Sequence, residues 1–388
     1  MRNRLWALGL TATLAACGGG GGGSSTTPPT KDDSVSTAAT QTQTALGATD
    51  LGTATTKVYD VAADIGDTWR ITFNTATNAY VVAVKNTVYG LTNTSTGTSG
   101  TYTSTTTGNL ASYVLSGSAG SLSVDTRTKD IAGKMTIGGK SSTVAGTSTA
   151  VTDLTKLAGI YNFMGAARNV SNGGSASSVA GQMKINADGV TATICEEGTF
   201  NAAGVCDSGN PSSPTVSHSM TLRIDNSDTT MPKIRMEFVT PEYQTEKDFG
   251  IVNVQAGDLG AALVIDRFGH NAAGILRTGV FYAAKVQQLT GSNFDGTWKC
   301  SQFGVDQASL VLTTTNGSTS NAITDSTGAS HTENIYWNKV ADASSSTGVT
   351  LNGFAITVAG NSAVNLLPLS SSIFVAGINN APMACRKQ

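Results

Sequence analysis

The chain has 388 residues and a formal net charge of −2, and only 13% of its residues are charged. Ordinary globular proteins contain about 25% charged residues, so Thr, Ser, Asn and Gly must supply most of the polar surface here. A nearly neutral chain lacks the basic surface of nucleic-acid-binding proteins, and we expect no nucleic-acid partner. At about 150 residues per domain, the length suits two or three domains.

The first sixteen residues have the pattern of a secretory signal. A basic start, Arg2 to Arg4, precedes an apolar stretch from Leu5 to Ala16, and a signal core has roughly 7–15 apolar residues. The stretch is shorter than the about 20 apolar residues that a membrane-spanning helix requires. We therefore predict that residues 1–16 form a signal peptide.

Residues 14–17 resemble the lipobox of bacterial lipoprotein precursors, with the sequence Leu14-Ala15-Ala16-Cys17. The resemblance implies cleavage before Cys17 and acylation of its thiol and amine, and Gly18, in place of an aspartate, implies export to the outer membrane. Because two or more acyl chains anchor a protein stably, outer-membrane lipid is the expected partner of Cys17. The alternative is an ordinary secretory signal with an incidental cysteine. Neither the surface nor the periplasmic face of the outer membrane is favoured.

Residues 17–56 are rich in Gly, Ser, Thr, Gln, Ala and Pro and contain few large apolar side chains. Such a segment buries too little apolar surface to offset the entropy lost on ordering. We therefore predict that this segment is a disordered, flexible tether that follows the lipidated cysteine.

Beyond Asp50 the apolar residues alternate with polar ones, which indicates β-strands. Two alternating runs flank a turn in residues 69–84 and again in residues 220–238, as expected for hairpins. A short helical turn is predicted at 152–157. The predicted fold class is all-β, with two or three antiparallel β-barrel or sandwich units after the disordered N-terminal tether.

Asn or Asp followed by Gly is typical of tight turns, because both residue types tolerate positive φ. The pattern predicts turns at three places: Asp188-Gly189, Asn316-Gly317 and Asn352-Gly353.

A glycine followed shortly by an aromatic residue at a strand start occurs three times: Gly66-Asp67-Thr68-Trp69, Gly159-Ile160-Tyr161 and Gly296-Thr297-Trp298. Repeated spacing of this kind indicates related units. We therefore expect three β-domains, with boundaries at 57–150, 155–289 and 290–388.

The Gly-x-Trp pattern at Trp298 resembles the first signature of lipocalin-like barrels, a Gly-x-Trp that follows a short helical turn. The resemblance covers a few residues only and implies an up-and-down barrel whose base is closed by Trp298 and, more loosely, by Tyr161. It implies a packing role for these side chains and no ligand contact. The alternative is an ordinary core aromatic residue at a strand start.

The chain has five cysteines. Lipidation takes Cys17, and four cysteines that remain in an exported chain indicate two disulfides with three connectivities. We favour Cys195–Cys206, which closes a short loop, and Cys300–Cys385, which ties the first strand of the last domain to the chain end. With three histidines and no Cys-x-x-Cys pair, a zinc site is not expected.

The densest group of reactive residue types is Asp266-Arg267-Phe268-Gly269-His270, which we predict to form a hairpin tip. An Asp and His pair supports acid–base catalysis beside a nucleophile, but Asp and Gly in such a loop more often serve turn geometry. Glu196, Glu197 and Asp207 are candidate calcium ligands, yet no spaced calcium-binding loop accompanies them. We therefore expect no catalytic residues, no metal and no cofactor.

The leading hypothesis is a cell-envelope lipoprotein with a binding or structural role at the outer membrane, whose partner is an envelope protein or a small ligand. One alternative is an envelope hydrolase acting on glycans or esters, in which Asp266 and Glu237 meet in one cleft. Another is a lipocalin-like carrier of a small apolar ligand, which needs a cavity of at least about 300 Å³ inside a barrel. No ligand-binding residue is predicted.

Overall fold

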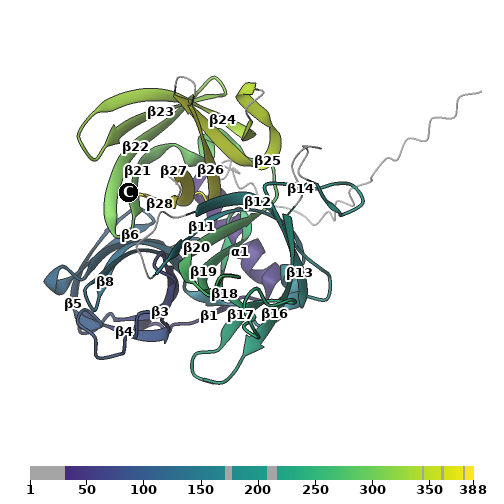
Figure 1. Ribbon diagram of the computed structural model, residues 1–388. Helices are drawn as coiled ribbons and strands as arrows, with labels where there is room; N and C mark the ends of the chain where they lie inside the picture. Colours follow the sequence, from purple (N-terminus) through teal and green to yellow (C-terminus); the bar gives the residue numbers. More distant parts are fainter. Residues whose placement is uncertain (1–30, 171–176, 208–215, 343–344, 360–361, 379–380) are drawn as a thin grey trace, which may run out of the picture.

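The computed structural model describes residues 31–170, 177–207, 216–342, 345–359, 362–378 and 381–388. These residues form three closed barrels, each of eight antiparallel strands. Figure 1 shows the three barrels packed against one another, with the first in blue, the second in teal and green, and the third in yellow-green. The all-β prediction is therefore confirmed, and all three units are barrels.

The first barrel closes through pairing of its first strand with its last. Its strands are β2 (Thr56–Ala63), β3 (Asp67–Asn74), β4 (Ala79–Asn86), β5 (Ser99–Thr107), β6 (Leu110–Leu115), β7 (Gly120–Asp125), β8 (Asp130–Ile137) and β9 (Lys140–Thr147). A 3₁₀ turn, η1 (Ser116–Ser118), connects β6 to β7. The predicted hairpin at residues 69–84 is the β3–β4 pair.

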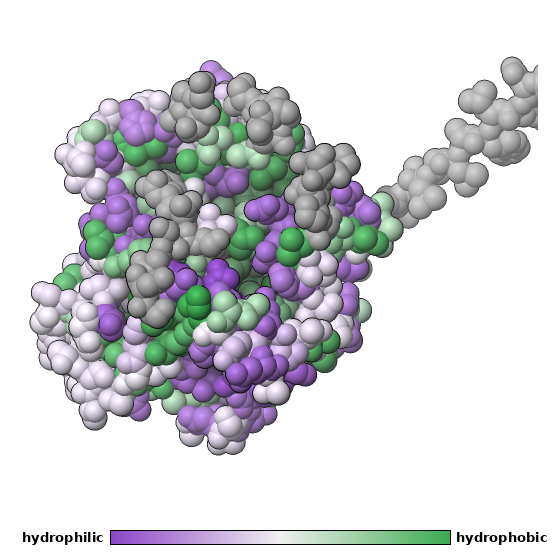
Figure 2. Space-filling model, in the orientation of Figure 1, coloured by the Kyte–Doolittle hydropathy of each residue, from purple (hydrophilic) through white to green (hydrophobic). Residues whose placement is uncertain are grey.

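The surface of the first barrel carries few charges. Its strand β5 is mostly exposed and has the sequence SGTYTSTTT. Figure 2 shows this part of the molecule, at the lower left, as largely pale, the colour of intermediate hydropathy. Thr and Ser thus cover an exposed sheet that charged residues would cover in an ordinary protein, since β-branched Thr packs well on a pleated surface.

The second barrel begins after a 3₁₀ turn, η2 (Leu154–Leu157). Its strands are β11 (Gly159–Asn169), β12 (Ser177–Ile185), β13 (Thr191–Glu196), β16 (Val216–Asp225), β17 (Lys233–Phe238), β18 (Asp248–Gly257), β19 (Gly260–His270) and β20 (Leu276–Lys285). A separate small hairpin, β14 (Thr199–Phe200) with β15 (Cys206–Asp207), projects between β13 and β16. The predicted hairpin at 220–238 is the β16–β17 pair.

The third barrel also begins after a 3₁₀ turn, η3 (Gly291–Phe294). Its strands are β21 (Gly296–Gln302), β22 (Val305–Thr315), β23 (Ser318–Asp325), β24 (Ser330–Asp342), β25 (Ser345–Ala359), β26 (Ser362–Ser370), β27 (Ile373–Ile378) and β28 (Ala381–Lys387). The long strands β24 and β25 extend beyond the region where β25 pairs with β26, so they form an arm on this barrel.

The segment before the barrels differs from the predicted tether. Residues 31–46 form α1 (Lys31–Leu46), and β1 (Thr49–Asp50) pairs with β10 (Thr149–Ala150). Val35, Ala39 and Leu46 are buried, and the helix packs on β18 and β19. Four- and seven-residue spacing places these side chains on one helix face. The flexible-tether prediction is thus wrong for residues 31–46, because the second barrel supplies the apolar partner that the segment lacks.

No helix in the described part of the chain has the length and apolar character that a membrane span requires.

Each barrel interior is filled by large side chains. Trp69, Phe73 and Leu122 lie in the first, Phe163, Met220 and Met236 in the second, and Trp298, Phe374 and Leu310 in the third. Interior positions alternate with exterior ones along each strand, which is the period of two seen in the sequence. Among the described residues, these side chains occupy the barrel interiors that a lipocalin-like carrier would keep open for its ligand.

A fourth apolar cluster lies outside the barrels and joins all three. The first barrel contributes only alanines to it, at positions 62, 132 and 145, whereas the other two contribute larger side chains such as Tyr282 and Phe354. Small residues allow two curved sheets to approach closely, so the alanines position the barrels against one another.

Polar contacts also connect the barrels. The Thr68 hydroxyl donates to Asp266 of the second barrel, and the Phe303 amide of the third barrel donates to Asp64 of the first. Asn162 of the second barrel donates to the Asn352 carbonyl of the third at 2.7 Å. Each pair of barrels is thus joined by at least one direct hydrogen bond.

The second and third barrels repeat one construction at their first strand. Tyr161 donates from its hydroxyl to the Leu157 carbonyl at 2.7 Å, and Trp298 donates from Nε1 to the Phe294 carbonyl at 2.9 Å. In each case a fully buried aromatic residue holds the 3₁₀ turn four residues before it.

The same construction includes the last strand of each barrel. Tyr161 pairs with Lys285 and Trp298 pairs with Lys387. Trp69 does not follow this rule, because it lies on the second strand of its barrel. The pattern at residues 66–69 is therefore not equivalent to the other two.

Both disulfides favoured from the sequence are present. Cys195–Cys206 closes a loop across a separation of 11 residues, and Cys300–Cys385 joins the neighbouring strands β21 and β28. Cys17 lies outside the described residues.

Candidate binding groove

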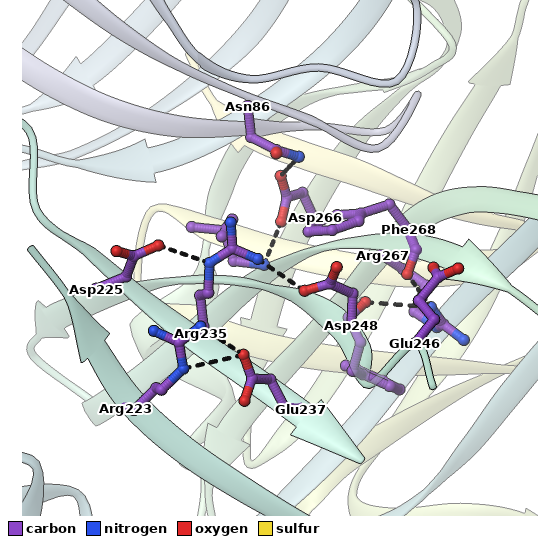
Figure 3. Close-up of polar contacts among 12 residues, drawn as sticks. Asn86, Arg223, Asp225, Arg235, Glu237, Glu246, Asp248, Asp266, Arg267 and Phe268 are labelled. Atoms are coloured by element: carbon purple, nitrogen blue, oxygen red, sulfur yellow. Dashed lines mark hydrogen bonds and ion pairs between the residues drawn. The ribbon is translucent and has the colours of Figure 1, made fainter. Parts of the chain in front are cut away.

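The residues of the Asp266–His270 group do not form one site. Asp266 points away from the second barrel and accepts hydrogen bonds from Thr68 and the Ile251 amide. Burial raises the pKa of this carboxyl well above its usual range. Figure 3 shows Asp266 directed toward Asn86 of the first barrel. Asp266 thus connects two barrels, and it lies inside β19 and not at a hairpin tip.

Arg267 points the opposite way, because successive side chains of a strand alternate between faces. Its guanidinium lies over the Phe249 ring, 4.6 Å from the centroid, and donates to the carbonyls of Phe249 and Phe268. Burial lowers its pKa to about 10. The aromatic ring and the carbonyls compensate for part of the lost hydration, so the guanidinium of Arg267 is held by contacts within the second barrel.

His270 pairs with Glu246 and not with Asp266. The distance from His270 Nδ1 to Glu246 Oε2 is 2.6 Å, and a second pair, His218 with Glu196, is 3.5 Å apart. The hydrogen bond with Glu196 raises the pKa of His218. The Asp266–His270 acid–base pair considered from the sequence is therefore absent.

Glu237 belongs to a charged network on the outer face of β16–β18. It accepts from Arg223 at 2.7 Å, while Arg235 lies between Asp225 and Asp248 at 2.8 and 2.7 Å. Figure 3 shows Arg223 beside Glu237, and Arg235 between Asp225 and Asp248. The two carboxylates of the hydrolase hypothesis therefore have different partners and do not share a cleft.

A large concave site lies between the second and third barrels. We call it the interbarrel groove, and its volume is about 710 Å³. The described residues that line it are Met164, Gly165, Ser178, Val179, Ala180, Gly181, Glu197, Gly198, Thr199, Asp207, Val340, Ala341, Val349, Thr350, Leu351, Phe354, Ala363, Asn365, Gly377 and Pro382. They come from both barrels, from the β14–β15 hairpin and from the β24–β25 arm.

The floor of the groove is apolar. Phe354 is 1% exposed and packs in the cluster that joins the barrels, together with Met164, and Leu351 packs against that cluster. Val349 lies at the opening and is 41% exposed. The groove thus offers a buried base that the barrel contact holds in place, and an accessible apolar wall.

The charged residues among the described lining are both acidic. Glu197 and Asp207 are exposed; Glu197 lies two residues before β14, and Asp207 is the last residue of β15. The Cys195–Cys206 disulfide ties this hairpin to β13, and the Glu197 amide donates to the Ala180 carbonyl at 2.8 Å. These two residues were considered as calcium ligands together with Glu196, and in the described residues no cluster has metal-ligating geometry.

Sequence reasoning missed the groove, because its lining is collected from many strands. One available signal was the cysteine spacing, which marked the hairpin that carries the acidic residues. A second signal was misread: Asn352-Gly353 was predicted as a tight turn, but it lies inside β25. Gly353 has φ +89° there, and the Asn352 carbonyl accepts the hydrogen bond from Asn162.

No protein-family model matches the chain, and no curated protein sequence matches it. Among solved structures, a double mutant of the vaccine antigen transferrin binding protein B from Haemophilus parasuis Hp5 has 11% identity and a TM-score of 0.22, covering 83% of this chain and 65% of that chain. Intact Ap-TbpB, with N and C lobes, has 12% identity and a TM-score of 0.17, covering 83% and 66%. This chain thus spans just under two thirds of those proteins, and TM-scores of this size do not establish a shared fold.

Proposed function

We propose that this protein is a lipid-anchored binding protein of the bacterial outer membrane and that the interbarrel groove is its binding site. The single observation that supports binding is the groove itself. Its volume of about 710 Å³ lies within the range of about 300–1,000 Å³ that is usual for ligand sites. Such sites occur preferentially where structural units meet.

The envelope location is supported by the sequence Leu14-Ala15-Ala16-Cys17, which resembles a lipobox. Thirteen residues separate Cys17 from the start of α1 at Lys31. At roughly 3.3–3.6 Å per residue, they reach at most about 50 Å when fully extended. The barrels would therefore stay close to the membrane, where an envelope partner or a ligand is accessible to the groove.

Filling the groove is expected to prevent binding. The variant Val349→Trp places a large side chain in the opening, at a position exposed enough to tolerate it. We expect the neutral fluorophore N-phenyl-1-naphthylamine to bind the wild-type protein, and binding to weaken by about tenfold or more in this variant, which corresponds to about 1.4 kcal/mol. Fluorescence titration measures both affinities.

Val311→Trp is the matched control, because Val311 is 45% exposed on β22 of the same barrel and does not line the groove. Its affinity should equal that of the wild type. Equal affinity in the Val349→Trp variant would show that the dye binds elsewhere and would remove the support for the groove.

Removing the anchor is expected to release the protein. In a Cys17→Ser variant no thiol remains to accept an acyl chain, so almost all of the protein should leave the membrane fraction, since stable anchoring needs two or more chains. Fractionation after metabolic labelling with an alkyne fatty acid measures retention and acylation together. A labelled, membrane-bound Cys17→Ser protein would contradict the anchor.

A further inference from the structure

We infer that the interbarrel groove takes an extended segment of a partner polypeptide, one that carries basic and apolar side chains and adds as a strand to the exposed edge of β25. This inference rests on the proposed function, because it requires the groove to be the binding site. It names the class of partner and the contacts that would hold it.

One wall of the groove is a strand edge. Pairing between β25 and β26 ends at Ala355 with Leu366, whereas Val349 and Thr350 pair with β24. In the described part of the chain, residues 349–351 of β25 therefore have no ladder partner on the β26 side. All three residues line the groove. An exposed edge of this kind is a template for another strand.

The opposite wall contains a second, shorter edge. Pairing of β12 with β13 ends at Gly181 with Glu196, and beyond it Ser178 and Val179 pair with β11. For the residues that the structure describes, these two have no strand partner on the β13 side. Both line the groove. An extended segment between the walls would thus meet backbone donors and acceptors on two sides, which is the basis of strand addition.

The side chains define what the segment must carry. Ala180, Val349 and Leu351 give the walls an apolar character. Glu197 and Asp207 supply the charge at the hairpin. Only these two of the described lining residues are charged, and Lys339, whose Nζ donates to the Thr350 hydroxyl at 3.4 Å, lies at the β24–β25 arm. A lysine or arginine of the segment would therefore meet the opposite charge at the hairpin end of the groove. A segment with alternating apolar and basic residues therefore matches both the walls and the hairpin.

The protein's own tether does not match this description. Residues 18–30 contain no charged residue and no large apolar side chain, only Gly, Ser, Thr and Pro. A proline removes a ladder donor. The occupant that fits is therefore a segment of another polypeptide.

The test uses the full chain and four capped seven-residue peptides with a fluorescent label. The first alternates valine and lysine, the second alternates valine and glutamate, the third alternates serine and lysine, and the fourth is the first peptide with every backbone nitrogen methylated. Fluorescence anisotropy gives each affinity. We expect the valine–lysine peptide to bind at least tenfold more tightly than each of the others, because each of those lacks the charge, the apolar contacts or the backbone donors.

Two protein variants complete the test. Glu197→Lys combined with Asp207→Lys should weaken binding of the valine–lysine peptide at least tenfold and should leave the neutral dye unaffected. The control is Asp50→Lys, which changes an exposed residue of β1 whose carboxylate pairs with Lys129 at the surface. The affinity of this variant should equal that of the wild type. Amide hydrogen exchange at residues 349–351 should slow when the peptide is bound.

Failure of this inference can be separated from failure of the proposed function. If the dye binds in the groove but no peptide does, or if the methylated peptide binds as well as its parent, strand addition is overturned and the groove remains a small-molecule site. If neither the dye nor any peptide binds, both proposals are overturned.

Discussion

Replacing Trp298 by alanine is expected to lower the free energy of unfolding by about 3–5 kcal/mol, the usual cost of removing a large buried aromatic side chain. Trp298 is 0% exposed and packs against Phe374, with ring centroids 4.6 Å apart. Its loss also leaves the Phe294 carbonyl without the indole donor that holds η3. The third barrel should therefore loosen at the junction of its first and last strands.

Chemical denaturation followed by near-ultraviolet circular dichroism measures this loss. The matched control is Tyr161→Phe in the second barrel, which keeps the ring and removes only the hydroxyl that donates to Leu157. It should cost about 0.5–1.5 kcal/mol, the net value of one hydrogen bond. If Trp298→Ala cost no more than this control, Trp298 would not be a core element of the barrel.

Raising the pH from about 4 to about 7 is expected to destabilise the fold through Asp64. Its side chain accepts from the amides of Thr143 and Phe303, and the residue is 3% exposed where the first and third barrels meet. Burial raises its pKa to about 7, against the lowering effect of those hydrogen bonds and of the Arg168 charge. The carboxyl is therefore protonated in the folded protein at pH values where the unfolded chain has already lost the proton.

The direction of the effect follows from proton linkage. Between the unfolded value near 3.8 and the folded value near 7, the native state binds one more proton than the unfolded state, so stability falls as the pH rises. At about 1.4 kcal/mol per unit of pKa difference, Asp64 should lower the free energy of unfolding by about 4 kcal/mol across this window. Below the window this contribution is fully present, and above it the contribution is lost.

Denaturant titrations at several pH values measure how steeply the free energy of unfolding falls as the pH rises. An Asp64→Asn variant binds no proton at this position. The slope of its free energy of unfolding against pH should therefore be smaller by the contribution of one proton, whatever its absolute stability. Asp60 shows the opposite behaviour: burial alone would raise its pKa, but Arg70 and Lys85 outweigh burial and lower it. The contribution of Asp60 to stability is therefore lost only in acid below about pH 4.

An unchanged pH dependence in the Asp64→Asn variant would show that Asp64 does not carry the proton.

The fold followed from the sequence to the extent that it depends on local pattern. Alternation of apolar and polar residues predicted the hairpins at 69–84 and 220–238, and the turns at Asp188-Gly189 and Asn316-Gly317 fall between consecutive strands. Local pattern was insufficient at Asn352-Gly353, where a kinked strand and a tight turn need the same residue types.

Helix α1 was missed for a related reason. Its sequence is polar and short of large apolar residues, so its own composition predicts disorder. The three buried side chains Val35, Ala39 and Leu46 stabilise it only because the second barrel lies beneath them. Helices in proteins owe most of their stability to such tertiary packing.

Local sequence thus accounts for the strands, for the two disulfide pairings that were favoured and for the resemblance to a lipobox at Cys17, because each depends on residues of one segment or on a small set of cysteines. The docking of the barrels and the interbarrel groove depend on which outward side chains gather across long separations in the sequence, as Ala62, Tyr282 and Phe354 do in one apolar cluster. Even adjacent residues can have different surroundings, because a strand directs neighbouring side chains to opposite faces. Asp266 contacts the first barrel, whereas Arg267 packs on Phe249 of the second barrel.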